Sequence, residues 1–164
     1  MQLFGKLFVD LHIQKEMEIY TSYFARQGKL REAGIVPIGI ALWPPKFFQG
    51  LHLQYLAPKR YMMKDEVTRE QYIQMYYRDV VGHLNPAQVI ADIERMSQGK
   101  DAALLCYEKP GDFCHRRLFA DWMLRETGLE IKEWEPSQKQ IEEQVAKQMQ
   151  TPVLEEPSLF DGLF

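Results

Sequence analysis

Cys-His-Arg-Arg at Cys114–Arg117 is the densest group of chemically active side chains in the sequence. It follows an apolar run that ends near Cys106 and a Pro-Gly turn at Pro110. This pattern predicts a buried strand, a turn and a helix that begins at about Cys114. In parallel α/β sheets, ligands bind where strands end and helices begin, and the N-terminus of a helix favours an anion. The segment is therefore the leading candidate for a functional site.

The first turn of this helix carries three cationic candidates. His115, Arg116 and Arg117 lie there, and a cation at this position opposes the helix dipole by roughly 0.3–1 kcal/mol. Asp112 is a candidate N-cap, and Arg117 can pair with Asp121 four residues later. His115 and Arg116 are left without a partner nearby in the sequence.

Two interpretations of these charges stay open. A phosphate or carboxylate ligand would neutralise them, or buried acids such as Glu108 or Asp79 would do so. In the first case Arg116 holds the anion, His115 serves as acid, base or donor, and Cys114 serves as nucleophile or as a backbone N–H donor.

Cys106 and Cys114 are the only cysteines. A thiol at a helix N-terminus beside a histidine has a lowered pKa, which makes Cys114 the candidate nucleophile, whereas Cys106 is expected to be a small buried residue. No secretory leader is recognisable, so we expect free thiols and a cytoplasmic protein. The C-x7-C-H spacing is not that of a zinc knuckle, and Asp112 stands where a Cys-x5-Arg phosphatase loop has arginine. We expect no metal and no other cofactor.

Composition restricts the class of protein further. The chain has 164 residues, a formal charge of -3, a sequence pI of about 5.8 and 46% apolar residues. These values exclude a disordered chain, a membrane-spanning protein and a basic protein that coats nucleic acid. From Arg125 onward nine acids face four bases, so the first 124 residues carry a net charge of +2. A local anion site is compatible with this distribution.

Strand and helix patterns alternate along the chain. They predict an α/β fold, a small three-layer and mostly parallel sheet with flanking helices, similar to a Rossmann fold. A long loop rich in aromatic and basic residues separates the second strand from the next helix. We expect an extension at 1–16, one domain at 17–150 and a tail at 151–164. The expected strands are 18–25, 35–42, 101–108 and 129–136, the loop is 43–65, and the main helices begin near Thr68, Asn85, Cys114 and Ser137.

Further candidate ligand-binding residues follow the first two strands, and Glu108 follows the third. With parallel strands, these residues would gather at the edge that holds His115. Hydroxyl, basic and aromatic groups together suit a nucleotide, with phosphate on Arg116 and a base stacked on Trp43 or Tyr61. Packing in an ordinary core is the alternative for the aromatic residues. The candidates are Thr21, Ser22, Arg26, Trp43, Lys46, Tyr61, Glu108 and Arg117.

ALLCYEKPGDFCHRR, with EIYTSYFA, IGIALWPP and YLAP, resembles the domain-of-unknown-function family 488. The resemblance covers Met17 to Pro136. It implies a small single α/β domain with its site at Cys114, His115 and Arg116, and it names no reaction.

The tail contains Ser158-Leu159-Phe160, which resembles part of a bacterial sliding-clamp-binding peptide. Packing of Leu159 and Phe160 on their own domain is the alternative. Three functions therefore compete: binding of a nucleotide or nucleic-acid phosphate, with or without catalysis; recruitment of a protein partner through the tail; and catalysis on a small carboxylate metabolite.

Overall fold

The computed structural model describes residues 15–109 and 112–150. These residues fall into two compact units that divide after Trp134. Most of the expected extension at 1–16 lies outside the described residues. The tail with Leu159 and Phe160 also lies outside them.

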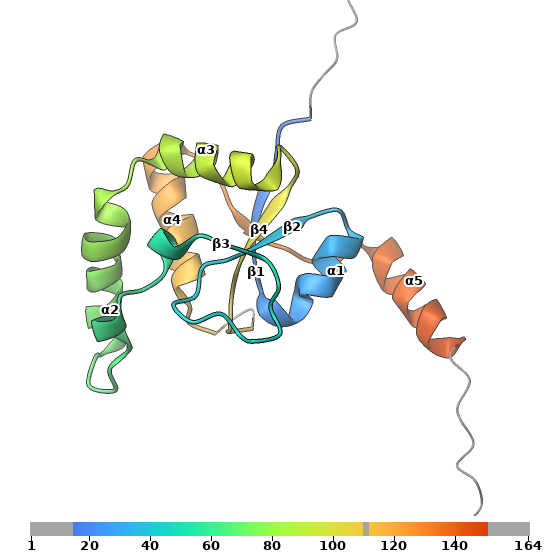
Figure 1. Ribbon diagram of the computed structural model, residues 1–164, viewed down its shortest axis with the longest axis horizontal. Helices are drawn as coiled ribbons and strands as arrows, with labels where there is room; N and C mark the ends of the chain where they lie inside the picture. The colour runs from blue at the N-terminus through green and yellow to red at the C-terminus, as the bar shows by residue number, and fades with distance from the viewer. Residues whose placement is uncertain (1–14, 110–111, 151–164) are drawn as a thin grey trace, which may run out of the picture. The chain divides into compact units, whose positions relative to one another are not determined.

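Five strands form one sheet in the order β3-β2-β4-β1-β5, and every neighbouring pair is parallel. The central strand β4 is buried along its whole length, as expected of a strand covered on both faces. The predicted α/β class with a parallel sheet is confirmed (Figure 1). The strands are β1 (Ile19–Tyr23), β2 (Val36–Gly39), β3 (Leu51–His52), β4 (Ala102–Cys106) and β5 (Lys132–Glu133).

Two of the helices begin at N-caps that the sequence predicts. Thr68 accepts a hydrogen bond from the backbone N–H of Gln71 in a capping box, and Asn85 caps the helix that begins at Pro86. The helices are α1 (Gln27–Glu32), α2 (Arg69–Met75), α3 (Pro86–Ser97), α4 (His115–Thr127) and, in the second unit, α5 (Gln138–Met149).

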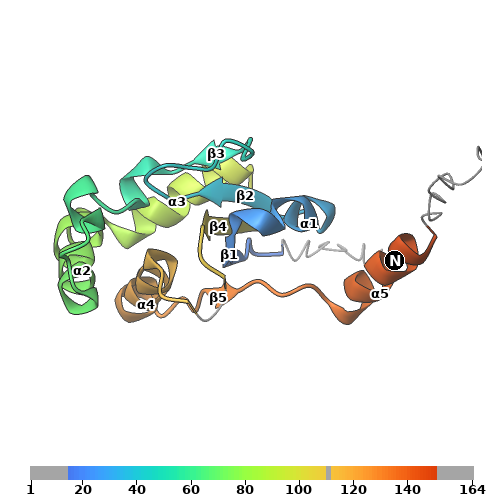
Figure 2. The same cartoon turned by 90° about the horizontal axis from the view of Figure 1, so that it is seen from below.

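Helices cover both faces of the sheet, which gives the three layers. On one face, α3 and α4 pack against Ile38 and Leu104 through side chains such as Ile93 and Phe119. On the other, Leu30 of α1 packs in a second apolar cluster. Figures 1 and 2 show α1 on the opposite side of the sheet from α4. This arrangement fixes the start of α4 against the end of β4.

The segment 43–65 is more ordered than an unbroken loop. It contains β3, which pairs with β2 in the register Ile38↔Leu51 and Gly39↔His52, and two short helical turns, η2 (Gln54–Leu56) and η3 (Arg60–Met63). The sequence missed β3 because two residues are too few to show an alternating pattern.

Candidate functional site

The start of α4 lies beside the end of β4. Cys114 has extended backbone angles and is the N-cap of α4, and its own side chain makes no capping hydrogen bond. The prediction that Asp112 is the N-cap is therefore wrong, because the N-cap position falls two residues later, at Cys114. Since the first backbone N–H groups of a helix have no partner within the helix, this end is suited to an anion.

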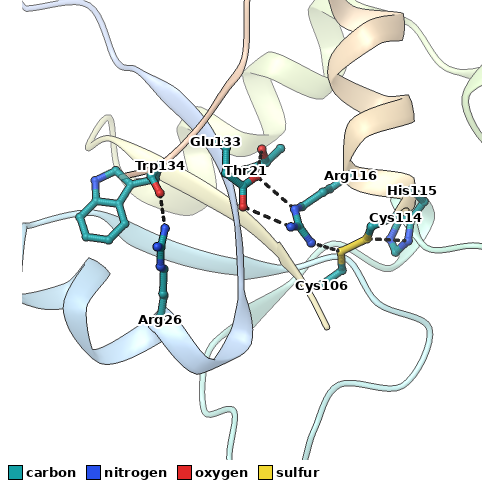
Figure 3. A network of polar contacts seen from close by, with 8 residues as sticks. All are labelled: Thr21, Arg26, Cys106, Cys114, His115, Arg116, Glu133 and Trp134. Atoms are coloured by element: carbon teal, nitrogen blue, oxygen red, sulfur yellow. Dashed lines mark hydrogen bonds and ion pairs between the residues drawn. A yellow bond between two sulfur atoms is a disulfide. The ribbon is translucent and has the colours of Figure 1, made fainter. Parts of the chain in front are cut away.

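Cys106 and Cys114 form a disulfide between the end of β4 and the start of α4 (Figure 3). The prediction of free thiols is wrong for this state, whereas the predicted burial of Cys106 is confirmed. Sequence spacing did not reveal the bond, because the intervening turn, and not a known cysteine motif, brings the two residues together.

His115 is buried and its ring is oriented by the backbone. Nε2 lies 2.7 Å from the carbonyl oxygen of Ile40, to which it donates, and Nδ1 lies 3.8 Å from Sγ of Cys114. A carbonyl only accepts hydrogen bonds, so Nε2 carries the hydrogen and Nδ1 presents a lone pair to the sulfur. Burial lowers the pKa of His115 to about 4, with a smaller contribution from nearby Arg116. The ring is neutral at pH 7.

Arg116 is only 1% exposed and is held by protein atoms. Its Nε and Nη2 donate to the Glu133 carboxylate at 3.1 and 3.2 Å, and Nη1 donates to Sγ of Cys106 at 3.0 Å. Thr21 also donates to Glu133, at 2.7 Å. Figure 3 shows this network on the side of α4 that faces the sheet. The guanidinium is therefore neutralised by the protein itself and presents almost no exposed surface to a ligand.

The acid that neutralises Arg116 is thus neither of the two that the sequence suggested. Asp79 forms an ion pair with Arg78, and Glu108 is exposed beside a cavity. Glu133 comes to Arg116 because β5 pairs with β1 in the register Thr21↔Glu133. Nothing in the sequence specified that register.

Cys114 lines two cavities. The smaller, of about 230 Å³, is also lined by Cys106, His115 and Glu108. Burial raises the pKa of Tyr72, which lines it too, so this side chain remains a phenol. The other lining residues are Ala41, Pro58, Met62, Met63, Lys64, Tyr107 and Phe113.

The larger cavity, of about 440 Å³, has two arginines in its wall. Arg69 lies with its guanidinium carbon 4.5 Å from the centre of the Phe113 ring, and Arg117 comes from the first turn of α4. The predicted pairing of Arg117 with Asp121 is wrong: among the described residues no ion pair within 4.0 Å includes either arginine. The wall also contains Ile73, Asp112, Cys114, Leu118 and Asp121. Sequence analysis missed Arg69, because it lies 45 positions before Cys114.

The remaining candidates lie away from these two cavities. Arg26 donates to the Trp134 carbonyl at 2.6 Å, and the buried Ser22 hydroxyl has no hydrogen-bond partner in the described structure. Trp43 is exposed and its carbonyl accepts from Tyr107. Lys46 is exposed, and the Tyr61 hydroxyl donates to Asp79. Neither Trp43, Lys46 nor Tyr61 is among the described residues lining either cavity.

Cys106, Cys114 and His115 place two sulfurs and a ring nitrogen within 4.8 Å of one another. Such donors suit a thiophilic metal when the sulfurs are thiolates. Here the sulfurs are bonded to each other, so the group is a disulfide beside a neutral imidazole. No helix of the described residues is long and apolar enough to cross a membrane.

The fold and site define a small parallel α/β protein with a Cys-His-Arg helix start. Residues 22–127 match the family model DUF488-N3a, described as the active DUF488-N3 subclade, and the chain belongs to this family. The match includes the last two residues of β1 and the whole of β4 and α4. Neither a curated protein nor a solved structure matches the chain.

Proposed function

We propose that the chain binds a phosphate-bearing ligand, a nucleotide or a nucleic-acid phosphate, at the start of α4 and acts on it through Cys114 and His115. The observation that carries this proposal is the position of Cys114. It lines both cavities, and one of them has Arg69 and Arg117 in its wall. The reactive sulfur and the available cations therefore border the same space.

Recognition of the phosphate falls to Arg69 and Arg117, and not to Arg116. Both side chains are exposed, and a guanidinium binds phosphate through two parallel hydrogen bonds. The N-terminus of α4 supplies backbone N–H donors. Asp112 and Asp121 line the same cavity and offset the charge of the two arginines, so the net charge of the cavity gives no general attraction of polyanions.

The smaller cavity suits the rest of such a ligand. Tyr72 and Tyr107 offer aromatic surface, and the Tyr72 phenol is a hydrogen-bond donor. Glu108 can accept hydrogen bonds from a base or a sugar.

The chemistry requires the reduced protein. With the disulfide opened, the Cys114 thiol faces the Nδ1 lone pair of His115 and donates a hydrogen bond to it; because the pKa of His115 is about 4, the ring takes the proton only as the sulfur attacks. The Ile40 carbonyl keeps the ring in this tautomer, as the carboxylate does in a catalytic triad. Arg116 serves as a positioning residue, because it joins Cys106 to Glu133 behind the reactive sulfur.

The test is a thermal-shift panel on the reduced protein with mononucleotides, short oligonucleotides and small carboxylates. We expect a nucleotide or oligonucleotide to raise Tm, and Arg69→Ala and Arg117→Ala to abolish the shift. Arg95→Ala, which removes an exposed arginine of α3 paired with Asp92, is the matched control and should keep the shift.

Two other outcomes contradict the proposal. A shift with carboxylates alone would indicate an enzyme of small carboxylate metabolism that uses the same cations. No shift with any compound would favour recruitment of a protein partner through Leu159 and Phe160, which stays a prediction.

A further inference from the structure

We infer that Cys106 and Cys114 are a thiol–disulfide exchange pair with unequal roles: Cys114 is the sulfur that exchanges with low-molecular-weight thiols and disulfides, and Cys106 is its buried partner. This activity does not depend on phosphate binding. It shares Cys114 with the proposed function, since the disulfide removes the thiol that the proposed function uses.

The surroundings of the two sulfurs differ in charge. Sγ of Cys106 accepts a hydrogen bond from Nη1 of Arg116 at 3.0 Å, and the guanidinium is fixed by Glu133. Sγ of Cys114 faces the neutral Nδ1 of His115 at 3.8 Å. A cationic donor stabilises a thiolate, and the thiol of lower pKa leaves faster in exchange. Cys106 is therefore the better leaving group.

The two sulfurs also differ in access. Cys114 lines both cavities, whereas Cys106 lines only the smaller one and ends a fully buried strand. A small thiolate thus meets Cys114 first. A cavity of about 230 Å³ admits a small thiol and is too small for a folded protein domain, so the partner is a low-molecular-weight thiol or disulfide.

The exchange with a dithiol proceeds in two balanced steps. One thiolate of the reductant attacks Sγ of Cys114; the Cys106–Cys114 bond breaks, and its electron pair remains on Cys106 beside Arg116. The second reductant thiol, after loss of its proton, attacks the reductant sulfur bound to Cys114 and expels the Cys114 thiolate, which takes up a proton. The protein gains two electrons and the reductant becomes a cyclic disulfide. A small disulfide reverses the sequence by accepting attack from Cys114.

Glutathione disulfide and single-cysteine variants test the assignment. In Cys106→Ser we expect a mixed disulfide at Cys114, detected by intact mass and peptide mapping. In Cys114→Ser we expect Cys106 to be modified about tenfold more slowly or not at all. Equal modification of the two cysteines would overturn the assignment.

Dithiothreitol tests the part played by Arg116. We expect Arg116→Gln to slow opening of the disulfide about tenfold, with Arg95→Gln, which changes an exposed arginine of α3, as the control that leaves the rate unchanged. If Arg116→Gln fails to fold, the Cys106 thiolate in Cys114→Ser is titrated by its ultraviolet absorbance. Its midpoint should lie below the ordinary thiol pKa of about 8.5, and a midpoint at or above that value would overturn the inference. Reduced wild type that holds one zinc ion per chain and does not re-form the disulfide would also overturn it, by making the three donors a metal site.

Discussion

The two sides of the start of α4 carry neighbouring arginines with opposite surroundings. Arg116 faces the sheet, is buried, and is neutralised by Glu133. Arg117 is exposed and lines a cavity with Arg69. Consecutive helix residues point about 100° apart, so one step along the chain moves a guanidinium from the inside to the surface. In a run of cationic residues at a helix start, the inward-facing member can pair with an acid of the protein itself. Only the outward-facing members therefore indicate a ligand site.

The largest expected effect is the difference in stability between variants of these two arginines. Arg116→Ala removes a buried side chain and leaves the partly buried Glu133 carboxylate without its ion-pair partner, and breaking a buried pair typically costs about 3–5 kcal/mol. Arg117→Ala removes an exposed side chain and should change the free energy of unfolding by less than about 0.5 kcal/mol. Urea unfolding of the oxidised proteins measures both values. Equal losses in the two variants would contradict the assigned difference.

The pH dependence of stability tests whether His115, on the buried side of the α4 start, is a neutral ring. His115 has a pKa of about 4 in the folded protein, whereas the ordinary pKa of a histidine side chain is about 6.5. Between these values the unfolded chain binds the proton more tightly, so stability is fully present above pH 6.5 and falls as the pH approaches 4. The loss amounts to about 3 kcal/mol at most. His115→Gln should remove this part of the pH dependence in urea unfolding, and an unchanged profile would show that His115 is not buried as a neutral ring.

A smaller difference in stability is expected between variants of two neighbouring residues of β1. Thr21→Val removes a hydrogen bond to the Glu133 carboxylate and should cost about 1.5–3 kcal/mol. Ser22→Ala removes a buried hydroxyl with no partner in the described structure and should be neutral or stabilising. Thermal unfolding gives both differences, and a larger loss for Ser22→Ala would reverse the comparison.

Local patterns in the sequence were enough to predict much of the fold. The caps at Thr68 and Asn85 and the buried strand before Cys106 are decided by short-range hydrogen bonding and hydrophobicity, and all three are confirmed. The two-residue strands β3 and β5 depend on pairing with distant partners. Their register, and with it the position of Glu133, could not be predicted from one sequence.

The candidate site stays a prediction, but the partners expected for its residues can be compared with the structure. Cys114 lines both cavities and His115 lines the smaller one. The disulfide to Cys106, the Arg116–Glu133 pair and the approach of Arg69 all depend on tertiary contacts between segments far apart in the chain or joined by an irregular turn. Such contacts cannot be inferred from residue types and their spacing in one sequence.

The most direct test of the central claim is calorimetric titration of the reduced protein with the nucleotide that gives the largest thermal shift. The compared proteins are wild type, the double variant Arg69→Ala/Arg117→Ala and the control Arg95→Ala. Loss of two charge-assisted hydrogen-bonding groups should weaken binding at least about tenfold in the double variant. The control should bind as wild type does. Equal affinity in all three proteins would contradict the claim that the exposed side of the α4 start binds phosphate.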